Sequence, residues 1–309
     1  MPLVEVEAGL FIGGEPDANP DNLSAKEISH VLTVNLRQPN KASGVVYKFI
    51  KVNDAPSEDL LSHFDSSCGF ISAALLGGGK VLVHCQHGIS RSATVIAAHL
   101  MRSHQISDQE ALQILYSKRS IRPNDGFKNQ LRAYHLMGFT VDSESTVYRL
   151  HNLSLSLLKT NDKKSLLHEF VPVKRGDDLQ LVDDCKSVDQ KHCVLRCRSC
   201  RHVLFTENSL LYHIRGGNRR LYEAFERENA DRLCTRHTYV LPVKWMARYV
   251  TQNEGKLYCP GRCGSKIGSF NWDGIRCDCG AQLSAVFQLF SKKIDKISAQ
   301  SYSDEKCDE

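Results

Sequence analysis

The residues that could do covalent chemistry lie in one short loop between a strand-like run and a helix-like run. Cys85 follows the apolar run VLVH, and Arg91 comes six residues later, where a helical stretch begins. The backbone N–H groups of such a loop converge on one point, and the helix that follows adds positive potential there. This field favours the thiolate of the cysteine, which is its nucleophilic form. The spacing therefore predicts a site for a phosphate dianion.

The other residues of this loop suit the same chemistry. The Arg91 guanidinium can present a fork to two phosphate oxygens, and the Ser92 hydroxyl can bond to the cysteine sulfur and help it leave. We expect the loop residues that bind the substrate to be Gln86, His87, Gly88, Ile89, Ser90 and Arg91. The alternative is a buried structural cysteine that only happens to precede a helix.

The segment HCQHGISRSATV resembles the active-site signature of protein tyrosine phosphatases, above all of the dual-specificity branch. The resemblance covers roughly residues 5–140 and includes GLFIGGEPDA, HVLTVN and IRPNDGF. It implies a central mixed sheet flanked by helices and a cysteinyl-phosphate intermediate without a catalytic cofactor. It also implies phosphoprotein substrates that carry phosphotyrosine and phosphoserine or phosphothreonine. The loop QHGIS contains no lysine, which favours phosphoamino acids over polyphosphorylated ligands.

A leaving alkoxide or phenoxide needs a proton, and a carboxylic acid on a separate loop can supply it. The resemblance places this acid before the cysteine, and Asp54 lies thirty-one residues before Cys85. We predict that Asp54 protonates the leaving group and then activates water. Glu58 and Asp59 are rivals, but they fall in an expected first helical turn, where carboxylates serve as caps. Asn124 either holds the signature loop, as the resemblance implies, or only caps a helix.

The second half of the chain suggests metal chemistry, because residues 181–309 hold ten of the twelve cysteines. Three close cysteine pairs, one histidine and one further cysteine supply eight ligands, enough for two structural zinc ions. The simplest pairing assigns one ion to Cys197, Cys200, His213 and Cys234. It assigns the other ion to Cys259, Cys263, Cys277 and Cys279. The rivals for a place in the first site are His237, His202 and Cys193.

The motifs PVKWM and LYCPGRCGSKIGSFNWDGIRCDCG extend the resemblance to the dual-specificity phosphatases that carry a C-terminal zinc-binding domain. The run Cys259-Pro-Gly-Arg-Cys263 has one residue more than the pattern of that subfamily. There the zinc domain is linked to assembly of the large ribosomal subunit, separately from phosphatase activity. The resemblance thus implies binding to pre-60S particles or RNA. Residues 191–260 carry thirteen Lys and Arg against six Asp and Glu, which suits such a partner or is only a solvated basic face.

Composition sets the remaining bounds. The chain has 309 residues, of which 41% are hydrophobic and 24% charged, as in a soluble protein of about two domains. A net charge of +5 is too small to indicate nucleic-acid binding by itself. The sequence shows neither a secretory signal nor an apolar run long enough to span a membrane. We therefore expect a cytoplasmic and nuclear protein without a membrane partner, whose clustered cysteines bind metal rather than form disulfides.

Apolar periodicity predicts an α/β layer with a parallel component in the first half. The expected strands are 9–13, 30–35, 46–52 and 80–85, and the expected helices are 57–76, 91–103, 107–118 and 125–137. Residues 143–159 are expected to form another helix, and residues 170–173 another strand. The predicted divisions are a catalytic domain 1–160, a linker 161–190, a zinc-binding domain 191–295 and a disordered tail 296–309.

Two functions fit these observations. One is a dual-specificity protein phosphatase, and the other is a non-catalytic ribosome-assembly factor in which phosphatase chemistry is dispensable. The two are compatible because they use different halves of the chain. A third reading is a redox sensor, in which Cys85 is oxidised and the zinc thiolates protect it.

Overall fold

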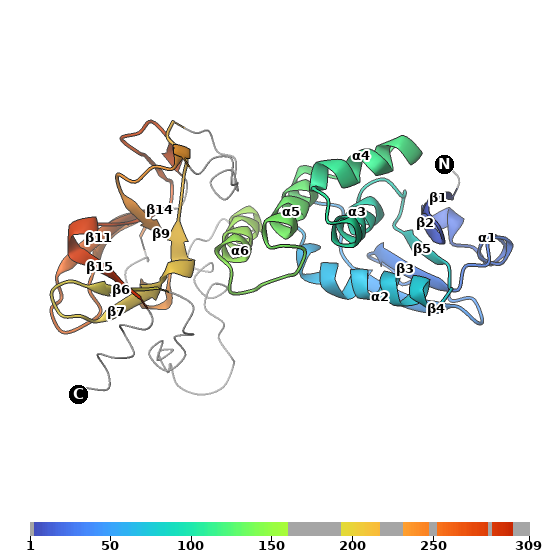
Figure 1. Cartoon of the computed structure of the whole chain (residues 1–309), viewed down its shortest axis with the longest axis horizontal. Coiled ribbons are helices and arrows are strands. Elements are labelled where there is room, and N and C mark those ends of the chain that lie inside the picture. The colour runs from blue at the N-terminus through green and yellow to red at the C-terminus, as the bar shows by residue number, and fades with distance from the viewer. Residues whose placement is uncertain (1–2, 160–192, 217–230, 247–251, 284–285, 299–309) are drawn as a thin grey trace. The chain divides into compact units, whose positions relative to one another are not determined.

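A computed structural model describes residues 3–159, 193–216, 231–246, 252–283 and 286–298 (Figure 1). The chain forms two compact units, Met1–Asp142 and Ser143–Glu309. The predicted linker 161–190, the strand predicted at 170–173 and most of the tail lie outside the described residues. In the described part of the chain, no helix is both long enough and apolar enough to cross a bilayer.

The first unit is built on a five-stranded mixed sheet, which confirms the predicted fold class. The strands lie in the order β1 (Val4–Glu7), β2 (Leu10–Gly13), β5 (Val81–His84), β3 (His30–Asn35) and β4 (Val46–Lys51). β1 is antiparallel to β2, and the other neighbours are parallel. β2 and β5 are buried along their whole length, as is typical of strands covered on both faces.

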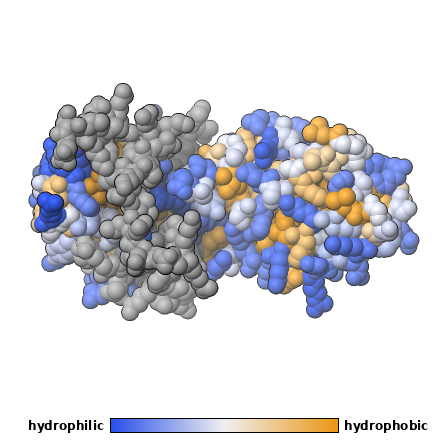
Figure 2. Space-filling model, turned by 90° about the horizontal axis from the view of Figure 1, so that it is seen from below, coloured by the Kyte–Doolittle hydropathy of each residue, from blue (hydrophilic) through white to orange (hydrophobic). Residues whose placement is uncertain are grey.

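Helices cover this sheet. They are α1 (Pro20–Ala25), α2 (Phe64–Leu76), α3 (Arg91–His104), α4 (Asp108–Lys118) and α5 (Asp125–Leu136). α3 contacts β2, β3 and β5 and also packs against α2, α4 and α5, so residues 91–101 are all buried. The start of α3 is thereby fixed in the core of the unit. Figure 2 shows hydrophobic residues lying between hydrophilic ones on the visible face of this unit.

Some elements differ from the prediction. β1, α1 and the 3-10 helix η1 (Glu15–Asp17) are additional, and α2 begins at Phe64 rather than at residue 57. Residues 53–60 form a loop before the 3-10 helix η2 (Leu61–His63). The side-chain oxygen of Gln130 accepts the N–H groups of Leu60 and Leu61 at 2.7 and 2.8 Å, so these groups are held by a distant helix rather than by a local one.

The helix predicted at 143–159 is α6 (Thr146–Lys159), which falls in the second unit rather than at the end of the catalytic domain. Two hydrogen bonds explain this placement. The Thr146 hydroxyl donates to the Asn208 carbonyl at 2.7 Å, and the Arg149 guanidinium donates to the Ser209 hydroxyl at 3.0 Å.

Three small antiparallel sheets make up the rest of the second unit. The largest has the order β10 (Glu254–Tyr258), β11 (Lys266–Asn271), β14 (Val286–Leu289), β9 (Thr238–Val240) and β8 (Leu210–Leu211). A second joins β15 (Ile294–Ile297), β6 (Val194–Cys197) and β7 (Val203–Thr206), and a third joins β12 (Ile275–Arg276) and β13 (Gln282–Leu283). Short 3-10 helices are η3 (Glu207–Ser209), η6 (Lys244–Met246) and η7 (Ser291–Lys293). β15 extends past residue 296, where the sequence predicts the tail to begin.

Candidate active site and metal centres

The loop from Cys85 to Ser90 joins the end of β5 to the start of α3, at the edge of the sheet where ligands of α/β proteins commonly bind. Cys85 is only 1% exposed. Its Sγ accepts the Gly88 N–H at 3.2 Å and lies 3.3 Å from the Ser92 hydroxyl oxygen. Both ends of the loop are fixed in the core, so the sulfur has a defined position at its base.

Electrostatics distinguish the two cysteines of the first unit. Burial by itself raises the pKa of Cys85, but hydrogen bonds from the Ser92 hydroxyl and from the backbone of Ser92, His87 and Gly88 outweigh it, so the pKa is lowered. Burial raises the pKa of Cys68, on the buried face of α2, to about 11, in keeping with a thiol that stays protonated. Cys85 is therefore the thiol of this unit with thiolate character.

A close approach of two backbone segments shapes the loop. Gly88 has φ +69°, and a side-chain carbon there would lie 2.5 Å from the Gly13 carbonyl oxygen. Only glycine fits this position. On the outer side, Arg119 donates to the carbonyls of Gly88 and His87 at 2.9 and 3.3 Å. Because these carbonyls face Arg119, the Gly88 N–H is turned toward Cys85.

Arg91 is 3% exposed and is held through one end of its guanidinium. Nη1 donates to the Asn35 side-chain oxygen and to the Val52 carbonyl, both at 3.2 Å. Among the described residues, Nε of Arg91 is buried without a hydrogen-bond partner. A buried donor without a partner is costly, and an anionic oxygen would satisfy it.

The predicted acid lies beside this arginine. Asp54 Oδ2 is 3.8 Å from Arg91 Nε, and Asp54 Oδ1 accepts hydrogen bonds from the Ser90 hydroxyl and the Asn124 amide, both at 2.8 Å. Asn124 also caps α5 by accepting the Phe127 N–H at 3.0 Å. Asn124 therefore caps α5 and also helps to hold the cysteine loop. Its side chain reaches that loop indirectly, through Asp54, which accepts the Ser90 hydroxyl.

The two rival carboxylates accept backbone hydrogen bonds within their own segment. Asp59 accepts the Ser62 N–H at 3.1 Å, and Glu58 accepts the Asn53 N–H at 3.4 Å. Asp54 is thus the carboxylate of this segment that contacts the cysteine loop. His84 lies below that loop: its Nε2 is 2.8 Å from the Thr33 hydroxyl, and burial lowers its pKa.

The eight candidate metal ligands form two clusters in the second unit, but the sequence-based pairing is corrected. One cluster contains Cys197, Cys200, Cys259 and Cys263. The other contains His213, Cys234, Cys277 and Cys279. The exchange arises because β6 and β10–β11 belong to different sheets that the fold brings together. The Cys197–Cys263 and Cys200–Cys259 sulfurs thus meet although 66 and 59 residues separate them in the chain.

The distances within both clusters fit a tetrahedral ion. The Cys197–Cys263, Cys200–Cys259 and Cys234–Cys277 sulfur pairs are 3.7, 3.6 and 3.9 Å apart. Thiolates on one tetrahedral zinc, with bonds of about 2.3 Å, would be about 3.8 Å apart. His213 Nε2 lies 3.3 Å from Cys279 Sγ.

The extra residue in the run from Cys259 to Cys263 is accommodated, since both cysteines belong to one cluster. The Gly261 N–H donates to Cys259 Sγ at 3.4 Å, and hydrogen bonds from Ser265 lower the pKa of Cys263 to about 6. The three rival ligands belong to neither cluster: Cys193, His202 and His237. His237, for example, pairs with Asp278 at 2.9 Å.

Known proteins resemble both units. A family described as "Dual specificity phosphatase, catalytic domain" matches residues 10–136. "Dual specificity protein phosphatase 12" of Homo sapiens is 34% identical, over 96% of this chain and 88% of that protein. This chain belongs to the dual specificity protein phosphatases. "Tyrosine-protein phosphatase yvh1" of Schizosaccharomyces pombe is 28% identical, over 96% of this chain and 85% of that protein. The solved "Yvh1 phosphatase domain from Chaetomium thermophilum" is 30% identical, with a TM-score of 0.43, and covers 46% of this chain and 99% of that chain.

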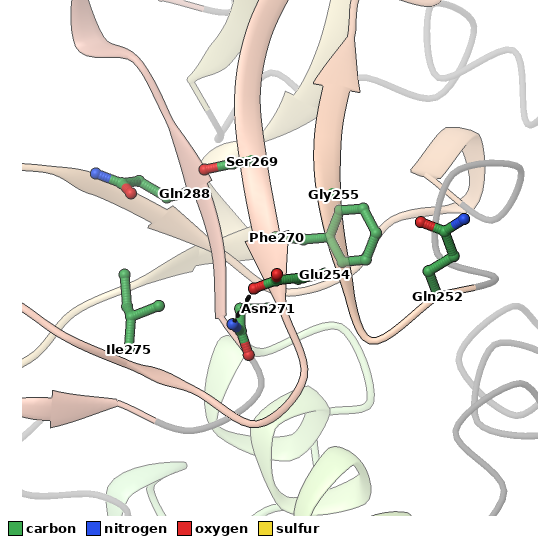
Figure 3. A pocket seen from close by; sticks show the side chains of 8 residues that line it. All are labelled: Gln252, Glu254, Gly255, Ser269, Phe270, Asn271, Ile275 and Gln288. Atoms are coloured by element: carbon green, nitrogen blue, oxygen red, sulfur yellow. Dashed lines mark hydrogen bonds between the residues drawn. The ribbon is translucent and has the colours of Figure 1, made fainter.

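The chain is thus a cysteine-dependent protein phosphatase, and its cysteine-rich C-terminal region fits the Yvh1 subfamily. A separate cavity of about 420 Å³ lies on β10, β11 and β14 of the second unit, where Figure 3 shows Phe270 beside Gly255 and Glu254 beside Asn271. None of the predicted site residues of the phosphatase lines that cavity.

Three residues that position the phosphatase site were not singled out from the sequence. They are Asn35, Arg119 and Gln130, which bond to Arg91, to the cysteine loop and to the loop that carries Asp54. The paired groups are 56, 31 and 69 residues apart in the chain. No local pattern marks them, because each acts on a segment from another part of the fold.

We predict that Ser92→Ala moves the titration of Cys85 upward. The substitution removes the largest interaction that lowers its pKa, while burial continues to raise it, so a higher pH is needed to form the thiolate. The measurement is the pH dependence of inactivation by iodoacetamide, followed as loss of phosphatase activity. Cys68→Ser is the matched control and should leave the midpoint unchanged. A midpoint that does not move in Ser92→Ala would contradict the assigned hydrogen bond.

Metal content of cysteine variants should reveal the pairing of the ligands. With two ions in the wild type, Cys197→Ser should retain one, and Cys197→Ser/Cys259→Ser should also retain one because both ligands serve the same ion. Cys197→Ser/Cys234→Ser should retain none. The sequence-based pairing predicts the reverse for the two double variants. Cys193→Ser is the control, and absorption spectra of the cobalt-substituted wild type distinguish a four-cysteine centre from a three-cysteine, one-histidine centre even if a variant unfolds.

Proposed function

We propose that the first unit hydrolyses phosphotyrosine and phosphoserine or phosphothreonine in proteins through a cysteinyl-phosphate intermediate on Cys85. The observation that carries this proposal is the buried Cys85 sulfur with two hydrogen-bond donors, the Gly88 N–H at 3.2 Å and the Ser92 hydroxyl at 3.3 Å. Such donors favour a thiolate in a site that excludes water. The Nε of Arg91, which has no hydrogen bond within the described residues, supports the presence of a phosphate oxygen beside it.

In the first step, the Cys85 thiolate attacks phosphorus, the S–P bond forms and the bond from phosphorus to the substrate oxygen breaks. The Arg91 guanidinium and the loop N–H groups other than that of Gly88, which donates to the sulfur, bind the three non-bridging oxygens throughout. Protonated Asp54 donates its proton to the leaving oxygen, so a neutral alcohol or phenol departs.

In the second step, water attacks the phosphorus of the cysteinyl-phosphate. Asp54, now a carboxylate, takes a proton from that water while the S–P bond breaks and inorganic phosphate forms. The Ser92 hydroxyl donates to the departing sulfur, which leaves as a thiolate. The Cys85 thiolate and the Asp54 proton are both restored, so the reaction needs no reactant other than the substrate and water.

We predict that Asp54→Asn lowers kcat for a phosphotyrosine or phosphothreonine peptide by about 10²- to 10⁴-fold, the usual contribution of a general acid. The loss should be smaller for p-nitrophenyl phosphate, whose leaving group needs less protonation. Asp59→Asn is the matched control, since that carboxylate only accepts a turn N–H. Unchanged turnover of the peptides by Asp54→Asn would assign the acid to another residue.

We further propose that the second unit holds two structural zinc ions and binds pre-60S ribosomal particles or RNA, in the cytoplasm and nucleus. The chemistry of the ligands supports zinc, because cysteine and histidine at tetrahedral spacing suit this ion. Exposed cations beside the first cluster support an anionic partner. Arg198 and Arg201 are 57% and 60% exposed and share one carboxylate, Asp295, so the group keeps a net positive charge.

Copurification with the tagged full-length protein tests this second role. We expect ribosomal components with wild type and with Cys85→Ser, and their loss with Cys197→Ser or after zinc chelation. That result would also favour a role in which phosphatase chemistry is dispensable. Equal recovery with and without chelated zinc would contradict the proposal, and loss in Cys85→Ser alone would tie the partner to catalysis instead.

A further inference from the structure

A cavity of about 510 Å³ in the first unit is not used by the proposed reaction. It lies between residues 15–20 and residues 37–42, the segments that follow β2 and β3. The side chains of Thr33 and His84, each 1% exposed, form part of its lining. The cavity therefore lies at the same carboxyl edge of the sheet as the cysteine loop, where ligands of α/β proteins commonly bind.

Asn35 connects this cavity to the phosphate site. Asn35 lines the cavity, accepts a hydrogen bond from Arg91 Nη1 at 3.2 Å, and donates to the Glu15 carboxylate at 3.1 Å. Successive residues of an extended peptide are about 3.8 Å apart. A phosphoresidue bound at Arg91 thus brings the residues next to it in the peptide within reach of the cavity.

The charged groups of the cavity favour an anion. Arg37 and Lys41 line it, both are exposed, and neither has an ion pair or side-chain hydrogen bond with a described residue. Glu15 is the one carboxylate among the described lining residues, and its Oε2 already accepts the Asn35 amide.

The uncharged lining suits a peptide. Gln38 and Asn40 carry amides that can donate to and accept from peptide groups, and Pro16, Pro20 and Pro39 supply apolar walls. A polar cavity with two free cations and adaptable amides fits an extended segment that carries one negative side chain.

We propose that this cavity is a substrate subsite for an anionic residue, either acidic or phosphorylated, that lies close in sequence to the residue being dephosphorylated. Arg37 and Lys41 bind the anionic group, and Asn35 connects the subsite to Arg91. The inference rests on the proposed phosphatase function and adds a substrate class to it: phosphoproteins with a neighbouring negative charge.

The experiment uses the full chain and one phosphotyrosine peptide, in which each of the two residues on either side is in turn Gln, Glu or a non-hydrolysable phosphonate analogue of phosphoserine. We expect kcat/KM to rise roughly two- to fivefold over the Gln peptide for Glu at one of these positions, as for an exposed ion pair. The phosphonate should raise it further if the natural group is a phosphate and no further if it is a carboxylate. Arg37→Ala/Lys41→Ala should reduce these ratios to about one.

Lys26→Ala/Lys118→Ala is the matched control, because it removes the same charge from exposed positions of the same unit that do not line the cavity. This variant should keep the wild-type ratios. An equal loss of the ratios in both variants would show general charge steering and overturn the subsite. Equal turnover of the Gln, Glu and phosphonate peptides by wild type would overturn it while the phosphatase function stands. No turnover of any peptide would overturn both.

Discussion

The Cys85 sulfur has to carry a negative charge at a position that is 1% exposed to water. Burial works against that charge, so the surrounding chain must supply the hydrogen bonds that water would otherwise provide. Gly88 turns with positive φ to direct its N–H at the sulfur, and Arg119 holds the loop carbonyls on the far side. The close approach of Gly13, the burial of α3 and the side chain of Ser92 all serve this one requirement.

The parts of this site that could be read from the sequence are those that depend on neighbours in the chain. The run from Cys85 to Ser92 fixes the loop and the start of α3 within eight residues. Asp54 was predictable because a family pattern relates it to Cys85. Gln130 and Asn35 were not, because their hydrogen bonds join segments that only the folded sheet brings together. The start of α2 was missed for the same reason, since Gln130 holds the N–H groups of Leu60 and Leu61.

The two units are stabilised in different ways. The first buries β2, β5 and most of α3 in one apolar core. The second has three small sheets, and small layers of this kind bury little apolar surface. Its two ligand clusters tie these sheets together: the first joins β6 to the turn after β10, and the second joins residues near β8 to the β12–β13 hairpin. The sequence-based pairing failed because it assumed that neighbours in the chain share an ion.

The ligands of the two clusters alternate along the chain, which has a consequence for synthesis of the protein on the ribosome. Cys197 is separated from its partner Cys263 by 66 residues, and at most three of the four ligands of the second cluster are present until Cys279 has been made. At bacterial or eukaryotic rates of synthesis this interval lasts roughly 3 to 13 seconds. During it the early cysteines exist as unpaired thiols on a growing chain, after the first unit has been completed. A metal ion could therefore complete its four ligands in either cluster only after most of the second unit has been made.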